Sequence, residues 1–321
     1  MGSRRTANSI SFPRAALFLG AILVVALMFF TAPLHPAAQA PAPRSASLHI
    51  ATWNVHDCSA ADRKSGTTLL FHAQIAAMLR EQQIDVIAFQ EIQTEGRKGA
   101  DIALLSAALE RAGWPMPHVA VAKGPQSDDL AIFSRYPIAE ARSILDPRGK
   151  NWPRPALEAR IDAEGAQLTL YCAHFKAYDD TRSLGQRLAQ ASALSALIRE
   201  EFADTLGGEA IVVLGDFNTV SPYDAQAGGT LDSLQLRDDT ESANDFLSVN
   251  MKWLYFAPTY VSSKYSSITD HLIVSPVLAR DADRDSIRVL DAPDSGSGFP
   301  ISDHKLLVYG LSLGSLPRSG Q

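Results

Sequence analysis

A carboxylate and a carboxamide stand two positions apart, directly after an apolar run in the middle of the chain. The run at 211–214 is followed by Gly-Asp-Phe-Asn at 215–218. Because side chains alternate along an extended chain, Asp216 and Asn218 are expected to point the same way, with Phe217 turned into the core. Such a pair suits holding a nucleophilic water and a phosphate oxygen. The simpler interpretation is an ordinary turn after a strand, because Asp and Asn are common turn formers.

Two further apolar runs end on residues of the same kind. The run at 48–54 closes on Asn54, and the run at 84–91 closes on Glu91. Both patterns indicate buried strands. Open α/β sheets place their chemistry at the carboxyl ends of strands, so these side chains are expected to meet Asp216 at one edge.

A third group combines acids with an imidazole. Asp303 and His304 stand just before the apolar strand expected at 306–309, and Asp270 lies within the apolar stretch 267–274. An unpaired buried charge would be costly, so Asp270 needs a partner. His304 is the natural candidate.

Seven short motifs follow one another along the chain: Trp-Asn at 53, Gln-Glu at 90, Ser-Arg-Tyr-Pro at 134, Ala-His-Phe at 173, Gly-Asp-Phe-Asn at 215, Thr-Asp-His at 269 and Ser-Asp-His at 302. In order and spacing they resemble the endonuclease/exonuclease/phosphatase superfamily over residues 48–312. This superfamily includes deoxyribonuclease I, abasic-site endonucleases, inositol polyphosphate 5-phosphatases and neutral sphingomyelinases. The resemblance implies a hydrolase that splits phosphoesters with a divalent cation, which is Mg²⁺ or, in its place, Mn²⁺.

The resemblance also implies the fold, an α/β four-layer sandwich of two mainly antiparallel mixed β-sheets flanked by helices. In this chain an N-terminal hydrophobic segment precedes the expected domain. Length agrees, because the roughly 280 residues behind that segment suit one large domain better than two small ones. Helical patterns at 67–82, 100–112 and 183–202 alternate with apolar strands. We therefore expect a catalytic domain over 47–313 and a flexible tail over 314–321.

The metal ligands follow from the resemblance and from the chemistry of the donors. Mg²⁺ takes hard oxygen ligands and keeps several waters, so a few carboxylates suffice. Glu91 is the expected ligand, with Asn54 beside it, and Asp303 adds a second contact. In the structural alternative, Glu91 is an acid that caps a strand-end loop.

The remaining polar residues are assigned to proton transfer. Phosphodiester hydrolysis needs a positioned water, a proton acceptor and a donor to the developing oxyanion. His304 is expected to act as general base or transition-state stabiliser, with its tautomer and pKa set by Asp270. Asp216 would orient or deprotonate the water, and Asn218 would hold a phosphate oxygen. The sequence does not decide which of Asp216 and His304 takes the proton.

His174 closes the strand expected at 168–173 and so lies at the same edge. A lone histidine is often structural, but deoxyribonuclease I and the sphingomyelinases carry a histidine at the matching point, which favours contact with phosphate or protonation of the leaving group. Abasic-site endonucleases carry a tyrosine there, which argues against abasic-site repair. Asp128 or Asp129 would be the acid partner of His174, and Lys176 on the same face would add a phosphate contact.

A basic loop precedes the strand expected at 156–161. Arg148, Lys150 and Arg154 are interleaved with Trp152. The simpler interpretation is a solvated loop. Because members of the superfamily often place an arginine before this strand, facing the phosphate, Arg154 is the expected substrate contact.

Cys58 and Cys172 are the only cysteines. Each lies close in sequence to an expected site residue, so a disulfide between them is conceivable in an oxidising compartment. No Cys/His set with zinc spacing accompanies them, so neither is expected to bind metal or act as a nucleophile.

The first 46 residues predict a signal peptide or membrane anchor followed by an Ala/Pro-rich linker. Three arginines precede an uncharged run at 15–30, which is close to the length that a bilayer core demands. This charge orients the rest of the chain outward. Small residues at 38–40 resemble a cleavage site, although Pro41 disfavours cleavage. Either fate places the domain outside the cytoplasm, as a secreted, periplasmic or membrane-anchored protein.

The charge balance bears on the substrate. Three of the 29 basic residues and none of the 35 acidic ones lie in the first 40, so the remainder carries a net charge of minus nine. Domains that grip nucleic acid by releasing counterions are usually basic, although a metal ion can neutralise the scissile phosphate.

Three functions therefore stay open. An exported nuclease leads. A phosphodiesterase or phosphatase that acts on a phospholipid or small phosphorylated molecule follows, and membrane contact through an uncleaved N-terminal segment favours it. A non-catalytic binding module is third. The aromatic stretch 253–256 is expected to lie in the core rather than in a bilayer, and a monomer is the default.

Overall fold

The computed structural model describes residues 47–58, 65–94, 101–124, 128–145, 152, 154–237, 239–280, 282–294 and 300–318. The expected signal peptide or anchor at 1–46 and the basic residues at 148 and 150 lie outside these ranges. Within the ranges, no helix combines the length and the apolar character needed to cross a bilayer.

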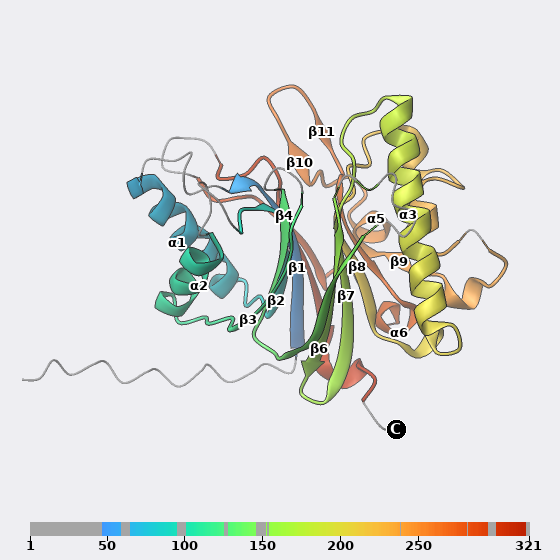
Figure 1. Ribbon diagram of the computed structural model, residues 1–321, viewed down its shortest axis with the longest axis horizontal. Coiled ribbons are helices and arrows are strands. Elements are labelled where there is room, and N and C mark those ends of the chain that lie inside the picture. Colours follow the sequence, from blue (N-terminus) through green and yellow to red (C-terminus); the bar gives the residue numbers. More distant parts are fainter. Residues whose placement is uncertain are drawn as a thin grey trace, which may run out of the picture. The chain divides into compact units, whose positions relative to one another are not determined.

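Two six-stranded β-sheets form the centre of the domain (Figure 1). The first sheet contains β13 (Ile287–Leu290), β14 (Leu306–Ser312), β1 (Ser47–Cys58), β2 (Val86–Ile92), β4 (Asp129–Ser134) and β3 (His118–Ala122), in that order. The second contains β5 (Ile138–Ile144), β6 (Ala156–Ala163), β7 (Ala166–His174), β8 (Ile211–Asp216), β12 (Asp270–Val274) and β9 (Leu247–Ser248). A separate hairpin pairs β10 (Tyr260–Val261) with β11 (Ser266–Ser267).

Strand direction is mixed in both sheets. The pairs β1–β2 and β7–β8 are parallel, and the other neighbouring strands are antiparallel. The expected pair of mainly antiparallel mixed sheets is therefore confirmed.

The two sheets pack on each other through aliphatic side chains. Ile50 on β1 faces Leu170 and Leu214 across this core, and all three are fully buried. Trp53, three positions after Ile50, faces the opposite side of its sheet, as the alternation of side chains along a strand requires. Apolar runs in these strands are thus continuous because both faces of each sheet are covered.

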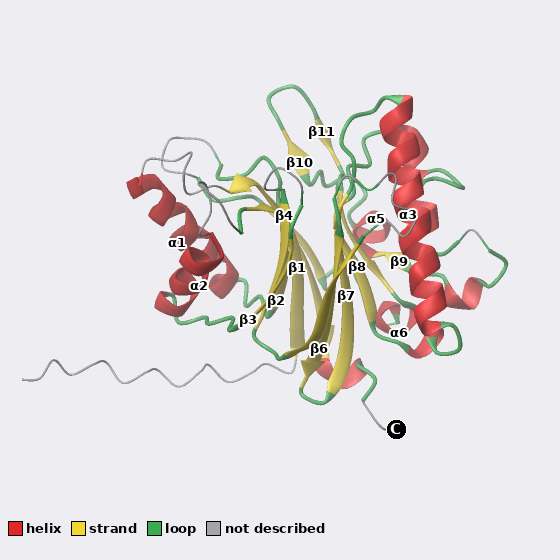
Figure 2. Cartoon of the chain, in the orientation of Figure 1, coloured by secondary structure: helices red, strands yellow, loops and turns green. Residues whose placement is uncertain are grey.

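Helices cover the outer faces of both sheets and complete four layers (Figure 2). The helices α1 (Ser65–Glu81) and α2 (Asp101–Arg111) pack on the first sheet, and α3 (Thr181–Phe202) packs on the second. Ala191, Leu194 and Ile198 form the buried stripe of α3, at the spacing of an amphipathic helix. The three helices expected from sequence are confirmed to within two residues at each end.

Short helices connect the later strands. They are α4 (Thr230–Leu234), α5 (Val249–Trp253), α6 (Pro276–Ala279) and the 3₁₀ turns η2 (Leu206–Gly208), η3 (Pro222–Ala225), η4 (Ser242–Asn244) and η5 (Leu313–Ser315).

The C-terminal boundary differs from the expected one. Leu316 is 4% exposed and packs in the core between the sheets, and Arg318 forms a β-bridge with Ala166. The expectation of a flexible tail from residue 314 is therefore wrong through Arg318, because one buried leucine holds the end of the chain. Residues 319–321 lie outside the described part.

The aromatic stretch 253–256 is only partly in the core. Trp253 and Leu254 are half-buried against the inter-sheet core, whereas the side chains of Tyr255 and Phe256 are 58% and 91% exposed. The expectation of burial is wrong for the last two residues, because α5 ends at Trp253 and the following turn carries them outward.

Candidate active site

The expected site residues meet because the two parallel strand pairs end near one another. In the second sheet His174 pairs in register with Asp216, and Asp216 pairs with Asp270 on the other side. In the first sheet Asn54 pairs with Gln90, the residue before Glu91. Carboxyl ends of parallel strands lie at one edge, so each sheet delivers its polar residues there.

A β-bulge turns Glu91 towards this edge. The pairing of β2 with β4 shifts between Gln90 and Ile92, and Glu91 has φ of +57°. Bulges re-aim side chains and often lie beside active sites. Gln90 and Ile92 stay buried while the side chain of Glu91 is 24% exposed, so the strand keeps its packing and presents one acid.

The close approach of β7 and β8 requires a glycine at position 215 of the Gly-Asp-Phe-Asn motif. Gly215 has φ of +141°, and a Cβ there would lie 2.0 Å from the carbonyl oxygen of Ala173. Only glycine fits this position. The motif therefore brings Asp216 close to His174 on the neighbouring strand.

Asn54 joins two acids. Its Nδ2 donates to Glu91 Oε1 at 2.9 Å and to Asp216 Oδ2 at 3.0 Å, while its Oδ1 accepts from the backbone N–H of His56 at 2.9 Å. The amide thus links the acid of the first sheet to the acid of the second. Its oxygen accepts one hydrogen bond and has a second lone pair, so the metal contact expected for Asn54 stays a prediction.

His304 and Asp270 form the expected acid–imidazole pair. His304 Nδ1 lies 2.9 Å from Asp270 Oδ2, and Thr269 Oγ1 also donates to that oxygen at 3.1 Å. Burial alone lowers the pKa of His304, but the charges of Asp270 and Asp216 and the hydrogen bond to Asp270 raise it to about 10.

Asp216 lies between two imidazoles. Its Oδ2 is 3.5 Å from His174 Nε2 and 3.8 Å from His304 Nε2, and its side chain is 1% exposed. Its other oxygen accepts from the backbone N–H of Asn218 at 2.9 Å. Asn218 has φ of +50° and donates from Nδ2 to the carbonyl of Phe175 at 3.1 Å.

His174 has Asp128, not Asp129, as its acid neighbour. His174 Nδ1 lies 3.4 Å from Asp128 Oδ1, and Arg154 Nε contacts the other oxygen of Asp128. Burial raises the pKa of Asp128, but His174 and Arg154 outweigh it, so the pKa lies below its ordinary value. Asp129 instead accepts from the backbone N–H groups of Gly124 and Thr94.

The two cations expected to bind substrate take different positions. Arg154 donates from Nη1 to the carbonyl of Phe175 at 3.1 Å and lies beside His174 through Asp128. Lys176 Nζ lies 4.7 Å above the ring of Tyr178. Arg154 is therefore near the acids of the site, and Lys176 contacts an aromatic ring in the loop after β7.

His56 is a neighbour of the site that the motifs did not include. Its Nδ1 lies 2.8 Å from Asp303 Oδ1, and the hydrogen bond to Asp303 raises its pKa, with the charge of Glu91 acting in the same sense. Burial raises the pKa of Asp303, but the hydrogen bond and charge of His56 lower it by more, so the pKa lies below its ordinary value. The alternation of side chains from Asn54 was the one signal in the sequence that pointed to His56.

The site offers oxygen and nitrogen donors that fit a divalent cation. Glu91, Asp128 and His174 present ligand atoms within 4.8 Å of one another. In the described part of the chain the buried Oδ1 of Asp270 has no hydrogen-bond partner, whereas Oδ1 of Asp128 and Oδ1 of Asp303 each face an imidazole nitrogen, at 3.4 and 2.8 Å. Unpaired buried carboxylate oxygens need a positive charge, and hard oxygen donors suit Mg²⁺ or Mn²⁺.

Cys172 is a free, fully buried thiol, so the conceivable disulfide with Cys58 is not formed. Its Sγ accepts from Gln90 Nε2 at 3.3 Å, and burial raises its pKa to about 12. A thiol in this state does not act as a nucleophile near neutral pH. The side chain of Cys58 lies outside the described part.

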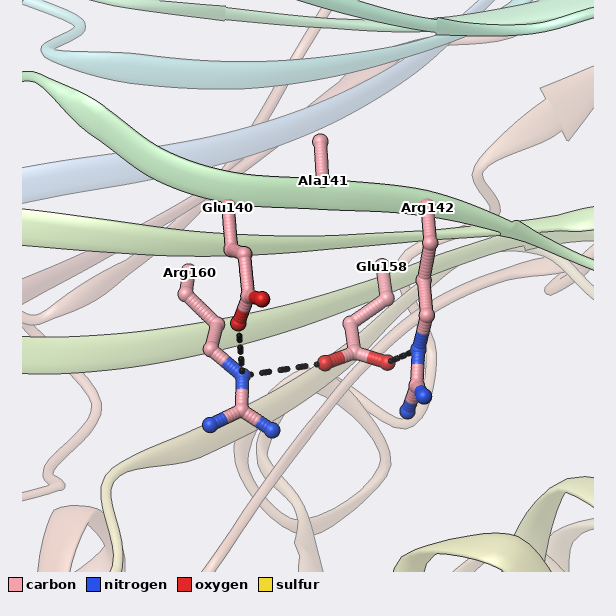
Figure 3. Close-up of a pocket in the computed structure, with 5 residues that line it drawn as sticks. All are labelled: Glu140, Ala141, Arg142, Glu158 and Arg160. Carbon is pink, nitrogen blue, oxygen red and sulfur yellow. Dashed lines mark hydrogen bonds and ion pairs between the residues drawn. The ribbon is translucent and has the colours of Figure 1, made fainter.

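A recess of about 220 Å³ lies beside β5 and β6 (Figure 3). Its charges pair with one another: Glu158 lies 2.5 Å from Arg142 and 3.2 Å from Arg160. Glu201 on α3 contacts both arginines. The recess contains none of the expected site residues, and its ion pairs hold α3 against the sheet.

Comparison with known families decides the relationship. The model of the endonuclease/exonuclease/phosphatase family matches residues 51–304. The chain belongs to this family. Family members are hydrolases of phosphoester bonds and use divalent metals. No protein among the curated ones searched by sequence matches the chain.

Solved structures of family members share the fold at low sequence identity. A humanized TDP2 from D. rerio aligns with a TM-score of 0.56 and 16% identity, over 83% of this chain and 99% of that one. An endonuclease/exonuclease/phosphatase from Beutenbergia cavernae aligns with 0.56 and 17%, over 83% and 72%. The human Nocturnin catalytic domain with bound sulfate aligns with 0.55 and 18%, over 82% and 92%. At these identities the likeness extends to the fold alone.

Proposed function

We propose that this endonuclease/exonuclease/phosphatase-family chain hydrolyses phosphodiester bonds in nucleic acid with a divalent cation, Mg²⁺ or Mn²⁺. The observation that carries the proposal is the position of Asp216. This buried carboxylate lies within 4 Å of two imidazoles, His174 and His304, and accepts from the amide that also holds Glu91. An acceptor, two proton-carrying rings and a metal-binding acid are thereby gathered around one point, as phosphoester hydrolysis requires.

Glu91 would hold the cation, with Asp128 or Asp303 as a further oxygen donor. When bound, the cation withdraws negative charge from the phosphate. His56 stands beside Asp303 and would compete with a cation for that acid when protonated. The fit rests on the carboxylates of Glu91 and Asp128, whose ligand atoms lie within 4.8 Å of each other and of an imidazole nitrogen of His174.

The chain's own residues divide the proton transfers. We assign Asp216 to orient the attacking water and take its proton, because an ionised carboxylate is an acceptor only. His304, held by Asp270 through Nδ1, would donate from Nε2 to the developing charge on phosphorus-bound oxygen. His174 would protonate the leaving oxygen as its bond to phosphorus breaks. Asn218, Arg154 and Lys176 would hold the substrate.

A second candidate substrate is a phospholipid or another small phosphodiester. Two observations favour it: the acidic balance of the chain behind residue 40 and the exposed side chains of Tyr255 and Phe256. Exposed aromatic side chains that adjoin one another suit a lipid or protein surface. Their rings are 5.1 Å apart, in an edge-to-face pair.

We also propose that the domain acts outside the cytoplasm. The support is the arginine-led apolar run at 15–30, which fits a signal peptide or an anchor.

Assays of the full chain would separate the substrates. We expect Mg²⁺-dependent cleavage of DNA or RNA that a chelator abolishes, and slower or no hydrolysis of sphingomyelin and inositol phosphates. Faster hydrolysis of sphingomyelin than of any nucleic acid would transfer the assignment to the lipid. A folded protein that splits none of these esters would support a binding module instead.

A further inference from the structure

A short hairpin stands beside the candidate active site. Figure 1 shows β10 and β11 projecting from the sheets as a separate ribbon. The backbone N–H of Val261 donates to the carbonyl of Asp303 at 2.8 Å, and that of Lys305 donates to the carbonyl of Thr259 at 2.7 Å. The hairpin is therefore joined at its base to the segment that carries His304.

A recess of about 490 Å³ lies between this hairpin and the loop after β7. Three tyrosines line it: Tyr178 from the loop, and Tyr260 and Tyr265 from the hairpin. His304 and Asn218 line it as well, so the recess opens directly onto the proposed reaction centre. The ring of Tyr260 lies 5.0 Å from that of His304, tilted by 55°.

Two of the three tyrosines are exposed to solvent. Tyr178 is 69% exposed and Tyr265 is 66% exposed. The turn that carries Tyr265 is fixed, because Ser262 accepts its backbone N–H at 3.2 Å and donates to its carbonyl at 3.0 Å. Rings held in this way offer apolar faces at little cost in conformational entropy.

We propose that this recess binds an unpaired nucleobase next to the scissile phosphate, by stacking on Tyr178 and Tyr265. The inference rests on the proposed nuclease function and names its substrate as single-stranded nucleic acid. Aromatic side chains that stack on bases are the sequence-tolerant way to bind single strands. A base inside a duplex is covered on both faces by its neighbours and must first be unstacked and unpaired, so a single strand is the favoured substrate.

Charge supports the base rather than the backbone as the occupant. Asp179 lines the recess and repels a phosphate, while its carboxylate can accept from the exocyclic amine of a base. The chain behind residue 40 is acidic, so long backbone contacts through counterion release contribute little. Stacking beside one metal-neutralised phosphate supplies affinity without a basic groove.

The test uses the full chain with Mg²⁺ and four substrates: a single-stranded oligonucleotide, the same sequence as a duplex, a complete dinucleotide, and the same dinucleotide without one base. We expect single strands to be cleaved with higher kcat/KM than duplex. Removal of one of the two bases should lower kcat/KM by about 5- to 150-fold, the range found for stacking.

Variants of the lining residues identify the stacking surface. Tyr265→Ala and Tyr178→Ala should each lose a similar factor on the complete dinucleotide and little on the abasic one, because the base and the ring form one interaction. Tyr265→Phe should keep the rate. Tyr223→Ala is the matched control, since Tyr223 is 63% exposed on η3 and does not line the recess.

The outcomes separate this inference from the proposed function. Equal cleavage of duplex and single strand, or equal losses on complete and abasic dinucleotides, overturns the base-binding recess and leaves the nuclease intact. Failure of the folded wild-type protein to cleave any nucleic acid overturns both.

Discussion

Asp270 shows how a buried charge predicts its partner. An acid inside an apolar strand had to be neutralised, and the structure places His304 Nδ1 2.9 Å from it. The pairing fixes which ring nitrogen of His304 faces Asp216, a detail that the motif alone does not contain.

We predict that Asp270→Asn lowers kcat by at least about 100-fold while the protein stays folded. The amide would leave the ring of His304 free to adopt the wrong tautomer. Steady-state kinetics and circular dichroism would measure the two effects. Asp285→Asn, an exposed acid before β13, is the control and should keep its rate. A fully active Asp270→Asn enzyme would remove the pair from the mechanism.

Residue types and order predicted most of the members of the site, but not their contacts. Asp216, His174 and His304 lie together as expected. The path of the chain after β1 places His56 where its backbone N–H donates to the Asn54 oxygen and its ring pairs with Asp303. These contacts cannot be predicted from residue types alone.

At the scale of elements, one buried arginine ties three segments together. Arg187 on α3 is fully buried and forms a two-pronged ion pair with Asp224 on η3, at 3.0 and 2.8 Å. It also donates to the carbonyls of Lys176 and Tyr178. The loop that presents Tyr178 is thus fixed from behind by α3.

We predict that Arg187→Met lowers the free energy of unfolding by about 3 to 5 kcal/mol, because it leaves Asp224 buried without a counter-charge. Urea denaturation would measure the loss. The double variant Arg187→Met with Asp224→Leu should recover much of it. Exposed Arg182→Met is the control, and a loss no larger than that of the control would contradict the account.

His271 on β12 makes stability depend on pH. Burial lowers its pKa to about 4 from the ordinary 6.5, and its Nε2 lies 2.7 Å from Thr219 Oγ1. Below pH 6.5 the unfolded chain takes up the proton first, so stability is present above that pH and is lost as pH falls towards 4. The loss from this group should reach about 3 kcal/mol.

The check compares urea midpoints of the wild type and His271→Gln between pH 7 and 4. The variant lacks the titrating ring, so its stability should fall less steeply across this window. Identical slopes would show that His271 does not contribute.

Periodicity predicted the long elements but not the short ones. The helices α1, α2 and α3 and the central strands carry runs of apolar residues that alternate or recur at helical spacing. The bulge at Glu91 and the two-residue strands of the β10–β11 hairpin depend on a few tertiary hydrogen bonds. Phe256 lies outside the core because α5 ends at Trp253 and the chain turns outward, and Leu316 lies in the core directly after η5.

At the scale of the whole molecule, the two sheets have complementary tasks. The first sheet supplies Glu91 and Asn54, and the second supplies Asp216, His174 and Asp270. Hydrogen bonds of Asn54 join the two sets. The proposed active site therefore needs residues of both packed sheets.

The N-terminal segment leads to a prediction about where the protein is located in the cell. The apolar run at 15–30 should bring the protein into the membrane or export it. In cell fractionation we expect the full chain in the membrane or outside the cytoplasm, and a chain that begins at Ser47 in the cytosol. Equal distribution of the two in the cytosol would contradict export.

The central claim is that the acids and imidazoles at this edge form one metal-dependent hydrolytic site. Its most direct test is the rate of oligonucleotide cleavage as Mg²⁺ is titrated against a chelator, measured for the wild type and for Glu91→Gln and Asp216→Asn. Glu110→Gln is the control, because Glu110 is exposed on α2. The account predicts that chelation abolishes cleavage, that Mg²⁺ restores it, and that the two site variants lose at least about 100-fold. Cleavage that survives chelation, or a folded Asp216→Asn protein with the wild-type rate, would contradict it.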